Sequence, residues 1–232
     1  MASFSTTATV ADPRISLGED GRPDYGTRLR RARLGLVVVL TPILMVFVSF
    51  SSAYVVRQGL PSLDPRTATL VRDWIPITLP KLLLINTGVL VLSSLFMELA
   101  RRRINGQART ALAAENIPPK VSASGQMSMP WLSLTLVLGL AFLVGQWMAW
   151  KQLAANGFYV ATTPSSSFVY LLTGTHAVHL MGGVVALFVA GIASLLRRSL
   201  ATRSIVVDVT AWYWHFMAGL WIYILCLLEF AS

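Results

Sequence analysis

The three histidines of this chain are the side chains best suited to chemistry, and all of them lie in its last two apolar segments. His176 and His179 fall within residues 173–179, TGTHAVH, and His215 falls within residues 213–216, YWHF. Imidazole binds haem iron, zinc and copper, and it gains or loses a proton near neutral pH. His176 and His179 stand three residues apart and therefore share one side of a helix. The pattern leaves three roles open: metal ligand, haem ligand or structural hydrogen bonding.

Membrane-spanning helices would position these histidines, because the sequence contains several long apolar stretches. Of its residues, 55% are hydrophobic and only 12% are charged, against about 25% charged in a typical soluble domain. A hydrocarbon core of about 30 Å is crossed by roughly 20 apolar residues in a helix. The sequence therefore predicts an all-α integral membrane bundle of five transmembrane helices. The segments are 34–56, 79–100, 131–153, 167–196 and 209–230.

Arginine and lysine are unevenly divided between the two sides of this predicted bundle. The N-terminal residues and the connections 101–130 and 197–208 carry fourteen of them, and the opposite side carries five. Because cytoplasmic loops are enriched in basic residues, we predict a cytoplasmic N-terminus and a periplasmic C-terminus. Residues 1–33 are predicted to form a disordered cytoplasmic arm, and residues 34–232 the transmembrane domain. The net charge of +9 then reflects contact with anionic lipid, and nucleic acid is not expected as a partner.

A metal shared by all three histidines is not expected, because they would lie at different depths. At 1.5 Å per residue, His176 would lie about 13 Å from the periplasmic end of its helix, and His215 about 9 Å from the cytoplasmic end of the next. Two bis-histidine haems would need four histidines. The single cysteine of the chain excludes disulfides and thiolate metal sites. We therefore predict no metal site, and interhelical hydrogen bonds for the histidines, with Asn86, Gln146 and Thr173 as partners.

Carboxylates are too scarce in the apolar segments to carry protons across a membrane. Glu98 lies one turn before Arg101 and Arg102 and is expected to pair with them at the interface. Asp208 and Glu229 are placed at the two ends of the last segment. We therefore expect no autonomous proton pathway through this chain.

Small residues recur every four positions in the fourth segment, at Gly182, Ala186 and Ala190. Small side chains at this spacing let helices approach closely in lipid. The face that they form is predicted to pack within the bundle, with a docking face for another subunit as the alternative. A basic cluster between the last two segments is predicted to bind lipid headgroups. Its members are Arg197, Arg198 and Arg203.

Taken in order, the polar and aromatic motifs resemble those of subunit III of the haem-copper terminal oxidases, the cytochrome c and quinol oxidase group. Residues 79–94 contain Leu-Pro, Leu-Ile-Asn-Thr and Ser-Ser, which are similar to one helix of that family. Residues 173–183 fit its TG-x-H-x-x-H-x-x-x-G pattern, and residues 213–221 fit YWHF-x-x-x-x-W. The matching positions include Asn86, Gly139, Phe142, Gln146, Trp150, Thr173, His176, His179, Gly183, Tyr213, Trp214, His215 and Trp221.

The chain also departs from the pattern of this family. Pro42 and Ile43 stand where many members have Ser-Glu, and Ala149 and Ala218 stand where members have an acid. A role as proton-collecting antenna is therefore not carried over from the family. The match begins near residue 34 and does not include the two additional N-terminal helices of longer members, so the lipid-filled cleft that those helices form is not carried over either.

By this resemblance, the chain would be a non-catalytic subunit of an oxidoreductase complex in the inner membrane of a bacterium, which it would cross several times. It would bind the large haem-copper subunit I and subunit II in a hetero-oligomer, sustain oxygen reduction by subunit I, and bind phospholipid. Haem and copper would belong to the partner subunits. The alternatives are a subunit-III-like accessory protein of a nitric oxide reductase and a stand-alone b-type membrane cytochrome. A transporter is disfavoured by the absence of internal repeats.

Overall fold

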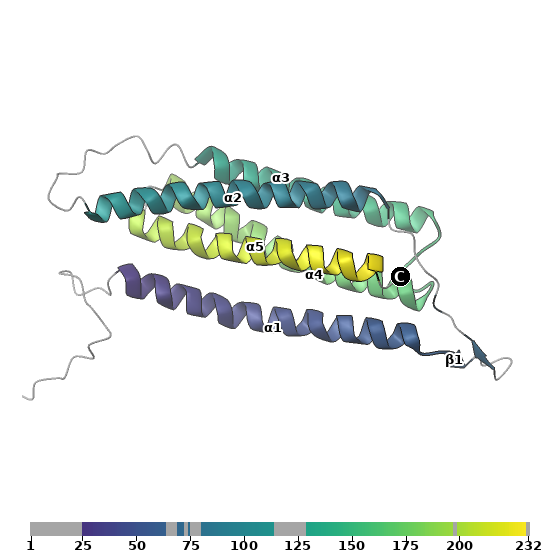
Figure 1. The fold of residues 1–232 in the computed structure, drawn as a ribbon. Helices are drawn as coiled ribbons and strands as arrows, with labels where there is room; N and C mark the ends of the chain where they lie inside the picture. Colours follow the sequence, from purple (N-terminus) through teal and green to yellow (C-terminus); the bar gives the residue numbers. More distant parts are fainter. Residues whose placement is uncertain are drawn as a thin grey trace, which may run out of the picture.

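Five long helices run side by side in the computed structural model, which describes residues 25–63, 69–71, 74, 80–113, 129–196 and 199–230 (Figure 1). All five are long and apolar enough to cross a membrane. The predicted all-α membrane bundle is therefore confirmed, while the direction in which it crosses the membrane stays a prediction. The helices are α1 (Tyr25–Gly59), α2 (Leu82–Ala113), α3 (Met129–Ala155), α4 (Pro164–Leu195) and α5 (Leu200–Phe230).

A short hairpin follows α1 and is the one addition to the predicted all-helical fold within the described residues. Strand β1 (Ser62–Leu63) pairs antiparallel with β2 (Leu70–Val71). In Figure 1 the hairpin extends beyond the end of the bundle at which α1 stops. The prediction missed it because strands of two residues carry no alternating pattern that a sequence could reveal.

Three helices extend by nine residues or more beyond the apolar segments that predicted them. α1 begins at Tyr25, so the last nine residues of the predicted disordered arm, 25–33, are helical; residues 1–24 lie outside the described residues. α5 begins at Leu200, nine residues before the predicted start, and α2 continues to Ala113. The length of an apolar segment predicts only the part of a helix that lies in the hydrocarbon core. The helix can continue beyond that part when the polar residues of its next turns form hydrogen bonds or pack against neighbouring helices.

The start of α4 has a clear local cause. Thr163 precedes the helix in an extended conformation, and its hydroxyl accepts a hydrogen bond from the backbone N–H of Ser166. The Ser166 hydroxyl is in turn bonded to the backbone N–H of Thr163, which completes a capping box. Pro164 follows at the first helical position, where its missing N–H costs nothing. α4 therefore begins three residues before the predicted segment.

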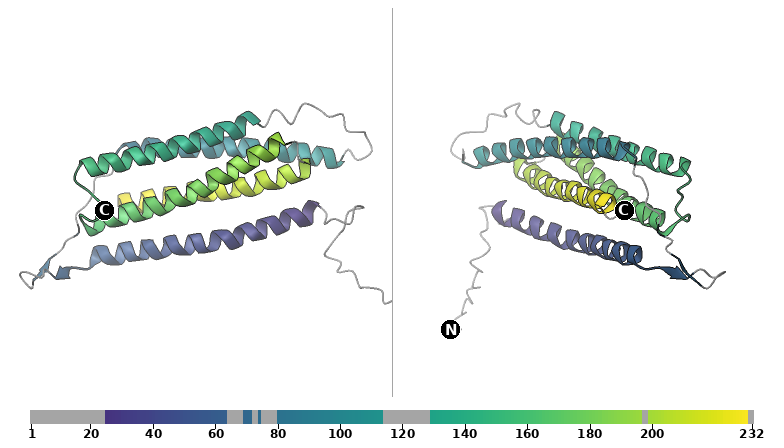
Figure 2. Two further views of the ribbon diagram at one scale, coloured as in Figure 1. Left: turned by 180° about the vertical axis from the view of Figure 1, so that it is seen from behind. Right: turned by 45° about the vertical axis from the view of Figure 1, so that its right-hand side comes forward.

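Helices α2 to α5 form a four-helix bundle, and α1 lies along one side of it against α4 and α5 (Figures 1 and 2). α1 buries a narrow stripe of Ile43, Phe47, Ser51 and Tyr54, while most of its other side chains are exposed. A helix in contact with lipid loses little by such exposure. The attachment of α1 therefore depends on a few specific contacts.

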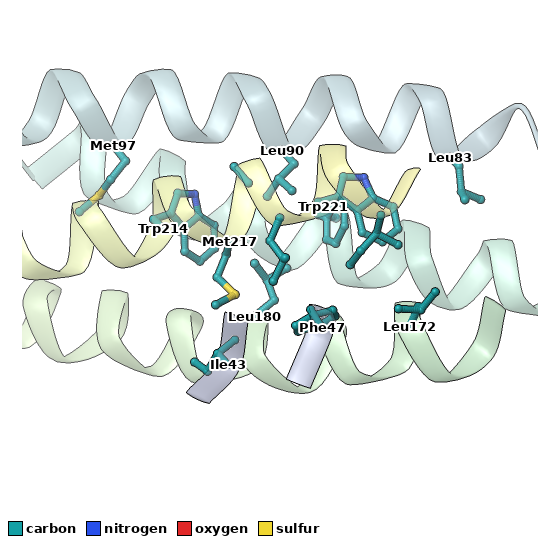
Figure 3. Packing of buried hydrophobic residues seen from close by; sticks show 14 of the residues in the cluster. Ile43, Phe47, Leu83, Leu90, Met97, Leu172, Leu180, Trp214, Met217 and Trp221 are labelled. Carbon is teal, nitrogen blue, oxygen red and sulfur yellow. The ribbon is translucent and has the colours of Figure 1, made fainter. Parts of the chain in front are cut away.

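The core runs along the length of the bundle and is centred on α5 (Figure 3). Trp214 and Trp221 are almost completely buried on this helix, as are Phe47 of α1 and Phe142 of α3. Trp221 therefore packs inside the bundle. The two indoles are also the largest buried side chains, so their fit decides how closely the neighbouring helices can approach.

Candidate functional site

Three consecutive residues of α5 connect it to different neighbours. The Tyr213 hydroxyl donates to the backbone carbonyl of His179 on α4 over 2.8 Å. The Trp214 indole N–H donates to the Ser93 hydroxyl on α2 over 3.2 Å. His215 bonds through Nδ1 to the hydroxyl of Ser94, also on α2, over 2.5 Å. Because successive helical residues turn by about 100°, three in a row can reach partners over half of the circumference of the helix.

Trp214 lies where the backbones of two other helices approach α5. A Cβ added at Gly139 on α3 would lie 2.7 Å from Cη2 of this indole, and one added at Gly183 on α4 would lie 3.2 Å from its Cε3. Real Cβ atoms essentially never approach as closely as 2.7 Å and seldom as closely as 3.2 Å, so glycine at both positions leaves the space that the indole fills. The YWHF sequence thus joins α5 to α2, α3 and α4 at one level of the bundle.

The position of close approach on α4 is therefore Gly183, and the predicted packing face based on Gly182 is only partly right. Gly182 is exposed, and a Cβ there would meet only the Tyr213 hydroxyl at an ordinary 3.5 Å. Ala186 is half-buried, and Ala190 is buried. The cause is helical geometry, because a step of four residues turns 400° and the stripe drifts by about 40° at each step. It begins on the surface and ends inside.

His176 does not form the predicted interhelical hydrogen bonds. It is completely buried on α4, and within the described part of the chain neither ring nitrogen has a hydrogen-bond partner. Aromatic rings surround it instead, with ring centroids 5.1 Å away at Trp221, 6.1 Å at Phe142 and 6.4 Å at Phe47. The imidazole therefore packs as an aromatic residue in this core.

The three residues predicted to bond to the histidines do not do so. Asn86 donates to the backbone carbonyl of Phe142 over 3.1 Å. Thr173 donates to the carbonyl of Val169 over 2.6 Å and accepts from the Trp150 indole over 3.1 Å. Gln146 has a buried Oε1 with no partner among the described residues. The prediction named the right class of buried polar residue but the wrong pairs, because pairing depends on how each helix is rotated about its axis.

His179 and Trp221 complete the positions singled out in the motifs. His179 Nδ1 bonds to the carbonyl of Thr175 in its own helix over 2.8 Å, and its ring packs 5.8 Å from that of Phe47. The Trp221 indole N–H donates to the Thr87 hydroxyl on α2 over 2.9 Å. Both side chains are thus occupied in joining helices.

A network of charged residues at one end of the bundle was missed by the sequence analysis, and Asp208 lies at its centre. The Asp208 side chain is 1% exposed and accepts from Arg33 of α1 over 2.9 Å and 3.2 Å. It also accepts from Arg101 over 3.2 Å and from Asn105 over 3.3 Å, both on α2. One buried carboxylate therefore joins three helices.

The predicted position of Asp208 at a helix end was wrong, because α5 begins at Leu200 and the residue lies two turns inside. The charge of Asp208 could have indicated the network from sequence. A single acid beside an apolar segment, with arginines nearby in the chain, must pair with a cation when its helix is buried. The sequence does not indicate that Arg33 and Arg101, among its arginines, are the ones that pair with Asp208.

Glu98 extends this network, and its predicted pairing is confirmed. Its carboxylate contacts Arg101 over 2.7 Å and Arg102 over 2.7 Å. His215 Nε2 lies 3.3 Å from the same group, so His215 does form interhelical hydrogen bonds, although not with the predicted partners. Arg101 joins the two carboxylates by contacting both. We call Arg33, Glu98, Arg101, Arg102, Asn105, Asp208 and His215 the charged network.

Of the three predicted lipid-binding arginines, only Arg203 lies within the described residues, and it is close to this end of α5. Arg203 is 7% exposed and lies on the inward side of the helix, which is not a position for a headgroup ligand. Arg197 and Arg198 lie outside the described residues. Burial of Arg203 follows from the early start of α5, because the helix carries this residue against its neighbours.

The arrangement as a whole is suited to holding helices together. Within the described residues, no three His, Cys, Asp or Glu side chains gather into a group that could hold a metal ion. The buried hydroxyls, indoles and imidazoles are each used in packing or in contacts between helices. Where haem and copper lie therefore stays a prediction about partner subunits.

Comparison with known proteins points to one family. The chain is 34% identical over 103 residues to a probable cytochrome c oxidase subunit 3 from Mycobacterium tuberculosis, an alignment that covers 43% of this chain and 49% of that protein. It is 32% identical over 92 residues to cytochrome c oxidase subunit 3 from Corynebacterium diphtheriae, covering 40% and 45%. A longer alignment, of 197 residues at 26% identity, joins it to cytochrome c oxidase subunit 3 from Pelomedusa subrufa and covers 83% of this chain and 66% of that protein.

The chain thus spans about half the length of the mycobacterial and corynebacterial relatives that it matches. No family model matches it. Every relative described above is named cytochrome c oxidase subunit 3, and the resemblance found in the motifs is confirmed by these names.

Proposed function

We propose that this chain acts as subunit III of a respiratory haem-copper oxidase of the cytochrome c oxidase type. It would contribute no catalytic group of its own. It would bind the large subunit I, with subunit II in the same complex, and support the assembly, stability and sustained proton-coupled turnover of the enzyme. The observation that carries this proposal is the similarity to proteins named cytochrome c oxidase subunit 3, one alignment of which covers 83% of the chain.

The way in which the motif residues are used supports a structural role. Tyr213, Trp214 and His215 connect α5 to α2 and α4, and the charged network adds α1. His176 is enclosed by the rings of Phe47, Phe142 and Trp221 and packs as a core residue. A subunit of this kind provides a stable apolar surface on which a larger membrane protein can pack.

We further propose that the complex lies in the inner membrane of a bacterium, that haem and copper are held by its partners, and that phospholipid fills its interfaces. The exposed apolar surface of α1 is compatible with either lipid or a partner helix. The basic residues at the end where α1 begins would then face the cytoplasm and its anionic lipid.

The decisive experiment is recovery of the tagged full-length chain from native membranes in mild detergent. The recovered material is examined by a reduced-minus-oxidised visible spectrum and by mass spectrometric identification of its subunits. We expect a haem-bearing subunit I of a cytochrome c oxidase in the eluate, and no haem on this chain once the two are separated. A chain that purifies alone with a haem band would overturn the proposal and restore the b-type cytochrome.

Two matched glycine variants make the result specific. Gly139→Ala places a Cβ against Trp214 and should reduce the amount of folded chain and of subunit I recovered with it. Gly191→Ala lies in α4 with nothing within 4 Å and should recover as much subunit I as the unaltered chain. Equal recovery with both variants would indicate non-specific co-purification. Recovery of a nitric oxide reductase subunit instead would identify the other family of partner.

A further inference from the structure

A small cavity lies between α2, α3 and α4, away from the charged network. Its lining includes Leu83 at the start of α2, Gln146 and Trp150 on α3, and Val169 and Thr173 on α4. The room available to the centre of a water molecule is about 10 Å³. This is the smallest space that holds one water, and it is too small for a lipid chain or an organic ligand.

Among the residues that line this cavity, Gln146 is the one with a buried side-chain polar atom that has no partner within the described residues. The residue is 2% exposed, and its Oε1 has no hydrogen-bond partner in the described part of the chain. A buried amide oxygen without a partner is costly, so native proteins pair nearly all such atoms with protein or with ordered water. A bound water molecule would account both for the unpaired amide oxygen and for the cavity that Gln146 lines.

The neighbouring hydroxyl can share a ligand with this amide. Thr173 Oγ1 uses its hydrogen to donate to the Val169 carbonyl and one lone pair to accept from the Trp150 indole. A hydroxyl oxygen has two lone pairs, so one remains for a further donor. A water molecule has two hydrogens and can donate one to Gln146 and one to Thr173. Cations are excluded by the lining, which contains no carboxylate.

We propose that one ordered water molecule occupies this cavity and joins Gln146 of α3 to Thr173 of α4. The water satisfies the amide, occupies the void and connects two helices at a level where the described residues form no direct side-chain bond between Gln146 and α4. The site is independent of the proposed oxidase role, because it requires only the bundle.

The test is an electron cryo-microscopy map of the protein in its native complex, at a resolution that shows ordered water elsewhere in the same subunit. We expect one isolated peak within hydrogen-bonding distance of the Gln146 amide and of Thr173 Oγ1. A cavity with no peak, or a Gln146 amide bonded to another protein group, would overturn the proposal.

Two leucine variants show whether the amide holds the water. Gln146→Leu removes the amide without a large change in side-chain volume, so the peak should disappear. Gln152→Leu replaces an exposed glutamine of the same helix and should leave the peak in place. A peak that persists in Gln146→Leu would show that the amide does not hold it and would overturn the proposal. If Gln146→Leu does not assemble, the map of the unaltered protein decides alone.

Discussion

One end of the bundle and its middle differ in how a buried polar side chain is accommodated. At the end where α5 begins, Asp208 accepts hydrogen bonds from Arg33, Arg101 and Asn105. Toward the middle, α5 carries Trp221 against His176, whose two ring nitrogens have no partner among the described residues. The charged group at the end is thus paired, while the imidazole in the middle is not.

This difference follows from the cost of desolvation. Removing an unpaired carboxylate from water costs several times more free energy than removing a neutral imidazole. The helices that carry the cations for a buried carboxylate must therefore pack against the helix that carries it. In the middle of the bundle the helices are positioned by shape, as when Trp214 fills the space above Gly139. The charged network determines the partners of α1, and the ring packing determines how closely α2 to α5 approach.

The comparison is tested most strongly by removing Asp208. Asp208→Ala leaves Arg33 and Arg101 without the carboxylate that joins them and should lower the free energy of unfolding by about 3 kcal/mol. It should also loosen α1, which limited proteolysis near Arg33 would detect. The measurement is thermal or denaturant unfolding of the purified protein in detergent. Glu229→Ala removes an exposed acid of the same helix and should lower the free energy of unfolding much less than Asp208→Ala does. Equal effects of the two would show that the network does not hold α1.

Shape is tested by adding one methyl group at Gly139. The new Cβ would meet the Trp214 indole at 2.7 Å, so Gly139→Ala should cost about 2 kcal/mol of stability through overpacking. Gly191→Ala, with open space around its Cβ, should be neutral or slightly stabilising because alanine is the better helix former. Both are compared by unfolding in the same detergent. If Gly139→Ala is as stable as Gly191→Ala, the indole is not tightly fitted.

Properties that depend on a single segment of the chain could be predicted from the sequence. Length and hydropathy predicted five helices, and spacing alone predicted the pairing of Glu98 with Arg101 and Arg102. Each of these conclusions needs only local periodicity or depth.

Properties that depend on the rotation of one helix against another could not be predicted. Gly182 and Gly183 are neighbours in sequence, yet only Gly183 lies close to the indole of Trp214. Arg33 and Asp208 are 175 residues apart, and nothing in either segment names the other. A turn of 100° per residue makes such contacts sensitive to a small rotation, which the packing of the whole bundle decides.

His215 is the histidine that lies in the charged network. His215→Phe keeps a ring of similar size but loses the bonds to Ser94 and Glu98, so it should lower the free energy of unfolding by about 1 kcal/mol. Glu98→Gln in the same background should then cost less than it does alone, because the two residues contact each other. Strict additivity of the two changes, measured by unfolding, would show that the 3.3 Å contact carries no energy.

His176 should respond in the opposite direction, and this is the smallest effect expected. His176→Phe removes two buried nitrogens that have no partner within the described residues and retains an aromatic ring among Phe47, Phe142 and Trp221. Replacing an unpaired polar group by an apolar one of similar shape is close to neutral or stabilising, so unfolding should shift by less than about 1 kcal/mol or toward greater stability. His176→Ala is the control, since it keeps no ring and should be clearly destabilising through the cavity that it leaves. A His176→Phe protein as unstable as His176→Ala would mean that the imidazole nitrogens are used in the assembled protein, and the contrast between a paired end and a shape-filled middle would no longer hold.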